Sequence, residues 1–111
     1  MADPIYLVQG DTGPQIQMTF TRSDTGEAED MQGATVNLHF RRKNRDTILF
    51  TLAGDGDLAI RENGKINFAF ESNQLDLNEG EYEGEVEVLF SGGTRETVYD
   101  TIDFILRKDF A

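Results

Sequence analysis

Residues 77–90 read LNEGEYEGEVEVLF and contain the clearest two-residue alternation in the sequence. Apolar residues and one glycine occupy the even positions: Tyr82, Gly84, Val86, Val88 and Phe90. Glutamates occupy the odd positions: Glu81, Glu83, Glu85 and Glu87. Because successive side chains of a strand point to opposite faces, the pattern predicts a strand with one face on a hydrophobic core and one carboxylate-lined face in water.

The length of 111 residues predicts one domain spanning residues 1–111, with a core large enough to form without metal or disulfide staples. Cysteine is absent, which excludes a disulfide framework, a thiol nucleophile and a Cys-ligated zinc or iron–sulfur site. Eight Phe, two Pro and no Trp suit ordinary strands, and 11 Gly indicate many turns. We therefore expect packing alone to stabilise the domain.

Ten Lys and Arg stand against 21 Asp and Glu, which gives a formal net charge of −11. This charge repels phosphate backbones, so we expect neither nucleic acid nor an anionic membrane as a partner. The charge either keeps a compact domain soluble or steers it onto a basic partner. Residues 1–10, MADPIYLVQG, contain neither the basic region nor the apolar run that export would need, and no segment approaches the roughly 20 apolar residues that span a bilayer. We expect synthesis and folding in a cytoplasm.

Further alternating or apolar segments predict strands at residues 5–8, 15–21, 33–41, 47–52, 66–70 and 94–107, the first of them at a sheet edge. The pair Asn63-Gly64 predicts a two-residue hairpin turn after the short segment 58–60, and residues 72–77 suit a helical turn. Asp100 falls on the inward parity of the last strand, so we expect a bulge or an exposed end near Val98 to Asp100. Seven or eight strands without helical periodicity indicate an all-β sandwich of two sheets.

The glutamates of the opening segment would repel one another unless a neighbouring strand supplies basic or neutral side chains. The strand that ends at His39 and Arg41 is the best candidate for that neighbour. Exposed pairs of this kind contribute only about 0.2 to 1 kcal/mol each, so they would set register more than stability.

Side chains that carry chemistry are few. His39 is the one histidine of the chain, and its place on the polar face of a strand indicates a solvated residue. Asp55-Gly56-Asp57 with Glu62 could offer oxygen ligands to calcium, but the further ligands of a calcium loop are missing, which favours a solvated turn. Asp11-Thr12-Gly13 matches an aspartic-protease triplet, yet Asp24-Thr25-Gly26 lies too close to supply its second half. We predict no catalytic residue, no metal and no cofactor.

Tyr82 stands in the sequence Leu-Asn-Glu-Gly-Glu-Tyr, which is typical of the tyrosine corner of Greek-key sandwiches. In that motif the tyrosine hydroxyl bonds to backbone upstream, so Tyr82 and Gly80 are predicted to be structural. The position two residues later, which is a cysteine in antibody domains, is Gly84 here. The domain is therefore not of the antibody type.

Four short motifs, taken in order, resemble a family of small bacteriophage virion domains that is typified by the N-terminal domain of tail baseplate upper proteins. They are Gly-Asp-Thr at 10–12, Met-Gln-Gly-Ala-Thr-Val at 31–36, Asn-Gly-Lys-Ile at 63–66 and Leu-Asn-Glu-Gly-Glu-Tyr at 77–82. The resemblance extends over nearly all 111 residues. It implies an immunoglobulin-like antiparallel β-sandwich of seven or eight strands with Greek-key connections, serving as an attachment module without catalysis. Baseplate upper proteins continue into further segments, so both a free-standing virion protein and an excised domain stay open.

These observations lead us to expect a non-enzymatic structural protein of a phage or prophage, located in the tail, baseplate or head–tail region and assembled in the cytoplasm of the bacterial host. Its partners would be other virion proteins, or further copies in a homo-oligomer. Its docking surface would be the face formed by Glu81, Glu83, Glu85 and Glu87 or an exposed edge strand. The alternative is a carbohydrate- or surface-binding module of a bacterial protein, for which exposed rings at Tyr6, Tyr99 and Phe110 would be the sign.

Overall fold

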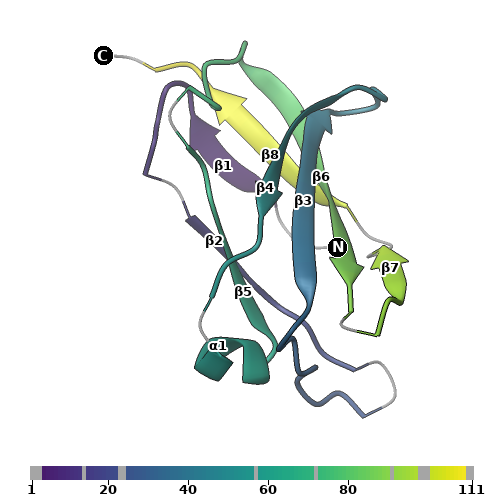
Figure 1. The fold of residues 1–111 in the computed structure, drawn as a ribbon. Helices are drawn as coiled ribbons and strands as arrows, with labels where there is room; N and C mark the ends of the chain where they lie inside the picture. The colour runs from purple at the N-terminus through teal and green to yellow at the C-terminus, as the bar shows by residue number, and fades with distance from the viewer. Residues whose placement is uncertain are drawn as a thin grey trace.

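The structure is a computed structural model that describes residues 4–13, 15–22, 25–56, 58–71, 73–90, 92–97 and 101–109. Within these ranges the chain forms eight strands and one short helix (Figure 1). The elements are β1 (Ile5–Val8), β2 (Gln15–Thr19), β3 (Thr35–Arg42), β4 (Ile48–Ala53), α1 (Leu58–Glu62), β5 (Lys65–Ala69), β6 (Gly80–Leu89), β7 (Arg95–Thr97) and β8 (Ile102–Arg107). None of the helical residues in these ranges belongs to a helix long and apolar enough to cross a membrane.

Two sheets make up the sandwich. The larger has the order β1-β8-β6-β3-β4, with β7 also paired to β6, and the smaller consists of β2 and β5. The chain passes from one sheet to the other between β1 and β2, between β2 and β3, between β4 and β5, and between β5 and β6. This arrangement confirms the predicted all-β, immunoglobulin-like sandwich. The opening segment forms β6, which lies in the middle of the larger sheet.

One strand pair differs from the predicted antiparallel arrangement. β1 runs parallel to β8, with Ile5 opposite Phe104, while the other strand pairs are antiparallel. The two strands are the first and the last in the described chain, so no hairpin connects them and no turn imposes an antiparallel direction. The larger sheet is therefore mixed.

The core lies between the sheets and is built from the side chains that the alternation assigned to it. Its buried members include Val36, Leu38, Phe40, Ile66, Phe68, Tyr82, Val86, Val88, Phe104 and Leu106. Phe40 is at the centre of an aromatic cluster, with its ring centroid 4.7 Å from Phe50, 5.3 Å from Tyr82 and 5.0 Å from Phe104. Aromatic rings bury large apolar surfaces, so this cluster contributes to the hydrophobic stabilisation of a chain without disulfides.

The predicted hairpin turn at Asn63-Gly64 is wrong. The segment before it forms helix α1, and Gly64 ends that helix with a φ of 77° and an N–H that donates to the Arg61 carbonyl at 3.0 Å. A glycine in the left-handed region is a common helix terminator, so the same dipeptide serves a different turn. A Cβ at Gly64 would lie 2.4 Å from the Phe20 carbonyl oxygen, so a side chain would also collide with the neighbouring backbone.

The last predicted strand, residues 94–107, is divided into β7 and β8, which pair with different parts of β6. Its inward residues Phe104 and Leu106 are buried as predicted, and Ile102 is half-buried. The bulge predicted near Val98 to Asp100 lies outside the described residues. Residues 73–75 form turns at the end of the sandwich, which agrees with the prediction that this segment is not a strand.

Candidate docking surface

Tyr82 anchors the turn that leads into β6. Its side chain is fully buried, and its hydroxyl donates to the Asn78 carbonyl oxygen at 2.5 Å. This is the backbone hydrogen bond that a tyrosine corner requires, and a buried hydroxyl needs such a partner. The Arg42 guanidinium covers the ring at 5.2 Å from the centroid. Gly80 has a φ of 148°, a conformation that residues with a side chain rarely adopt, which explains a glycine at the start of the strand.

The four predicted docking glutamates lie on the outer face of β6 and differ in exposure. Glu81 is exposed, and Glu85 and Glu87 are half-buried. Glu83 is only 8% exposed, so the prediction that it points into water is wrong. The turn after β3 folds over it: Arg41 Nε donates to Glu83 Oε1 at 2.9 Å, and the Asn44 N–H donates to the same oxygen at 3.4 Å. A charged donor provides the partner that a buried carboxylate needs.

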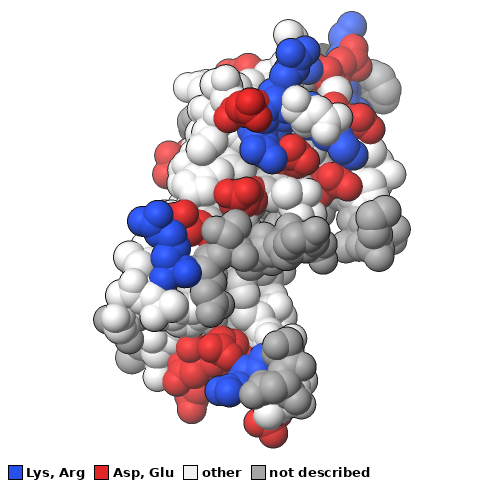
Figure 2. Space-filling model, turned by 90° about the vertical axis from the view of Figure 1, so that its right-hand side faces the viewer, with Lys and Arg blue, Asp and Glu red and all other residues white. Residues whose placement is uncertain are grey.

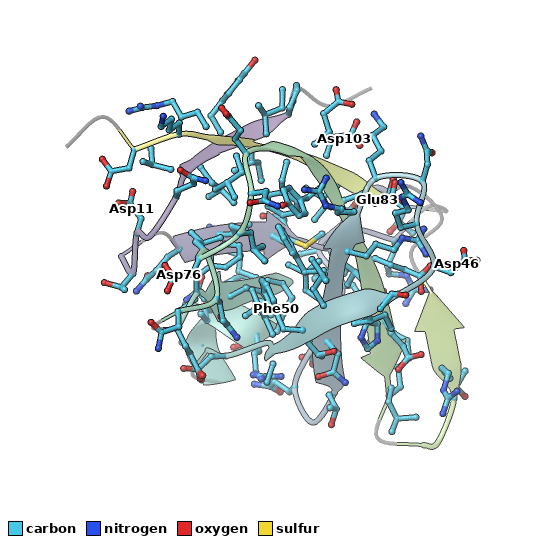
Figure 3. All side chains as sticks on the ribbon, turned by 90° about the horizontal axis from the view of Figure 1, so that it is seen from above. Asp11, Asp46, Phe50, Asp76, Glu83 and Asp103 are labelled. Atoms are coloured by element: carbon cyan, nitrogen blue, oxygen red, sulfur yellow. The ribbon has the colours of Figure 1, made fainter. Side chains whose placement is uncertain are left out.

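The predicted neighbour of β6 is confirmed. β3 pairs with β6 so that His39 stands opposite Glu85 and Arg41 opposite Glu83. On the other side of β6, β8 places Asp103 opposite Glu83, and Figure 3 shows these two carboxylates near each other on neighbouring strands. Like charges in this position repel, and Lys43 offsets the repulsion with its Nζ 3.7 Å from Asp103 Oδ1.

Glu87 also has basic neighbours, with His39 Nε2 and Arg95 Nε each 4.0 Å from one of its oxygens. Two of the four glutamates are therefore compensated within the molecule. Glu81 and Glu85 have no ion pair in the described part of the chain. The outer face is consequently a mixed pattern of acidic and basic groups, visible in Figure 2 as interspersed red and blue.

The other residues considered for chemistry are held in structural contacts. His39 Nδ1 lies 2.8 Å from Thr51 Oγ1 on β4. Asp55 accepts the N–H of Gly56 at 2.7 Å and pairs its backbone with Asn67, while Asp57 and Asp24 lie outside the described residues. Among the residues that the structure describes, no three His, Cys, Asp or Glu gather closely enough to hold a metal ion. Asp11 lies in an exposed turn.

Arg61 has a structural role that no sequence pattern predicts. Its guanidinium donates to four backbone carbonyls, of Ala34 at 2.8 Å, Gly56 at 3.0 Å, Met31 at 3.3 Å and Gly54 at 3.4 Å. The Arg61 carbonyl in turn accepts the Met31 N–H at 2.8 Å. The side chain thus joins α1 to the two segments that flank it in space. Backbone acceptors leave no trace in a sequence, so no pattern could have predicted this clamp.

β4 is a free edge of the larger sheet and carries exposed apolar side chains. Ile48 is 51% exposed and Leu49 is 43% exposed. An open hollow of about 420 Å³ lies beside them and is lined by Arg42, Arg45, Thr47, Leu49 and Asn78. The stretch Thr-Ile-Leu-Phe-Thr-Leu has the composition of a buried strand, so its exposed start was not predicted. At the opposite edge of the sheet, Tyr6 on β1 is 70% exposed, and Tyr99 and Phe110 lie outside the described residues.

The mixed sheet, the two-strand sheet and the tyrosine corner define the protein as an immunoglobulin-like β-sandwich. Comparison with protein-family models gave no match, and comparison with curated proteins gave none either. Among solved structures, the chain is similar to CopC from Methylosinus trichosporium OB3b, with a TM-score of 0.56 and 11% sequence identity, covering 96% of this chain and 86% of that chain. At this level of identity the similarity concerns the fold alone.

Proposed function

We propose that the protein is a non-enzymatic structural component of a phage or prophage particle that attaches other virion subunits to one another in the tail, baseplate or head–tail region. The observation that carries the proposal is the order of the four motifs that resemble baseplate upper proteins. Each motif precedes or opens a strand: residues 10–12 precede β2, 31–36 lead into β3, 63–66 into β5 and 77–82 into β6. The order of turns decides which strands become neighbours, so a shared order supports a shared fold, and the virion role is carried over from the resemblance by analogy.

The surface is consistent with attachment by contact. The charged groups of the outer face form cross-strand pairs such as Arg41 with Glu83, which fix register and present a surface of alternating sign. The larger sheet also has β1 and β4 as edges, and edge strands offer unpaired backbone groups to another chain. Glu81 and Glu85 supply the uncompensated acidic charge for a basic partner.

The proposal is tested by measuring the mass of the purified protein in solution and then mixing it with purified tail proteins from the same genome. We expect either an oligomer of defined size or a stable complex with at least one tail protein. The variant Glu81→Lys with Glu85→Lys should weaken a complex that uses the acidic face, and Glu27→Lys with Asp30→Lys, on the exposed connection between β2 and β3, is the matched control. A strictly monomeric protein that binds none of the tail proteins would contradict the proposal.

A further inference from the structure

The start of β4 exposes two consecutive apolar side chains. We call the surface formed by Arg42, Arg45, Thr47, Ile48 and Leu49 the β4 patch. Its exposure follows from a change of register: Phe40 pairs with Phe50, but Arg41 pairs with Ile48, which leaves Leu49 as an extra residue in β4. Such a bulge redirects side chains at the edge of a sheet. In a regular strand one of two neighbouring residues would face the core, whereas here both are exposed.

The β4 patch also has a sign of charge opposite to that of the molecule. The stretch Arg41-Arg42-Lys43-Asn44-Arg45 holds four of the ten Lys and Arg residues of a chain with a net charge of −11. Arg41 and Lys43 form ion pairs with Glu83 and Asp103 on the outer face. The other two line the hollow beside Leu49.

These two arginines, Arg42 and Arg45, differ in their contacts within the molecule. Arg42 packs over the Tyr82 ring, while Arg45 is exposed and has no ion pair in the described part of the chain. Asp46, which follows Arg45 in the sequence and is labelled in Figure 3, is also exposed. The hollow is lined by one apolar side chain, Leu49, and otherwise by the polar residues Arg42, Arg45, Thr47 and Asn78. A guanidinium without an ion pair next to an exposed leucine is suited to a carboxylate that arrives together with an apolar side chain.

We propose that the β4 patch binds an acidic peptide segment of a partner protein, with one apolar side chain in the hollow beside Leu49 and a carboxylate on Arg45. The inference rests on the proposed function, since it names the chemistry of the partner that the attachment module receives. Charge complementarity selects this occupant, because an acidic segment is attracted to the arginines of the patch. A second copy of the chain, which carries a net charge of −11, is the other occupant that the test distinguishes.

The test uses the ¹⁵N-labelled protein and two synthetic hexapeptides with blocked ends, one alternating glutamate and leucine and one alternating lysine and leucine. The glutamate peptide should shift the amide resonances of residues 45–50, and the lysine peptide should leave them unchanged. Raising the salt concentration from 0.05 M to 0.5 M should weaken binding of the glutamate peptide, because the contacts of Arg45 are exposed to solvent.

Variants locate the binding surface. Arg45→Glu and Leu49→Ser should each reduce the affinity for the glutamate peptide at least tenfold. Arg95→Glu and Leu89→Ser are matched controls on β7 and β6, where the same residue types are exposed, and should change it less than twofold. Thermal unfolding followed by circular dichroism checks that each variant is folded; if Leu49→Ser is unfolded, Arg45→Glu decides alone.

Three results would overturn the inference: equal binding of both peptides, shifts confined to another surface, or concentration-dependent shifts of residues 45–50 without peptide, which would make a second copy the occupant. The outcome is separable from that of the proposed function. If purified tail proteins bind Arg45→Glu as tightly as they bind the unchanged protein, attachment stands and the β4 patch is not its site. If the glutamate peptide binds the patch but no tail protein does, the patch stands and the virion role fails.

Discussion

Replacing Arg61 by lysine should destabilise the protein although the positive charge is kept. The guanidinium donates to the carbonyls of Ala34 and Gly56 at 2.8 and 3.0 Å and makes two longer contacts at 3.3 and 3.4 Å. A hydrogen bond from a charged donor contributes about 1.5 to 3 kcal/mol when it is buried, and the half-buried position of Arg61 places its bonds at the lower end.

A lysine ammonium can reach one or two of the four carbonyls, but it lacks the planar fork that serves them together. Counting the two short bonds as the principal loss and one as recovered by lysine, we expect Arg61→Lys to reduce the free energy of unfolding by about 1.5 kcal/mol. Arg61→Met, which recovers none, should reduce it by about 3 kcal/mol. For a domain of this size these losses lower Tm by roughly 6 and 12 °C.

Urea denaturation followed by circular dichroism measures these differences, and hydrogen exchange at the Met31 amide, which donates to the Arg61 carbonyl, reports the local opening. Arg95→Lys is the matched control, because the Arg95 side chain is 69% exposed and its replacement should change stability by less than about 0.5 kcal/mol. If Arg61→Lys is no more destabilising than Arg95→Lys, the clamp contributes nothing measurable and the reasoning from its carbonyl contacts is refuted.

Three further substitutions test the packing around β6, each by urea denaturation. Tyr82→Phe removes the tyrosine-corner hydrogen bond and leaves a backbone carbonyl to find water, so it should cost about 1 to 2 kcal/mol; a change below 0.3 kcal/mol would speak against the corner. Gly84→Ala places a Cβ 2.6 Å from a Leu38 methyl carbon and should cost about 1 to 3 kcal/mol, whereas an unchanged free energy of unfolding would show that the core has room. Arg41→Met leaves Glu83 nearly buried without its cation and should cost about 2 kcal/mol, most of which Glu83→Gln in the same chain should restore; failure of that rescue would mean that Arg41 acts by packing.

The strands that the sequence predicts correctly are those whose alternating residues show which face is buried and which charges a neighbouring strand must carry. β6 shows both faces in its sequence, and its glutamates required a neighbour with basic groups, which identified β3 through His39 and Arg41. Both inferences use periodicity and charge, which are local properties of a strand.

What the sequence could not predict depends on contacts between distant segments. Glu83 obeys the same alternation as Glu81, but the turn at residues 43–44 covers one and leaves the other exposed. The pair Asn63-Gly64 is as suitable for ending a helix as for a hairpin turn. Here the connection between the two sheets contains helix α1, so the pair ends that helix. Arg61 finds its acceptors on backbone that no residue pattern marks.

The parallel pairing of β1 with β8 affects the order in which the protein folds. During synthesis Ile5–Val8 leaves the ribosome long before Phe104, its partner in the sheet, has been added to the chain. Closing a loop of that length costs entropy before any contact compensates for it, and folds with such distant pairings are slow. The hairpin-like pairing of β3 with β4 can form as soon as both strands are available. We therefore expect β1 to be among the last of the described strands to be fixed in its sheet.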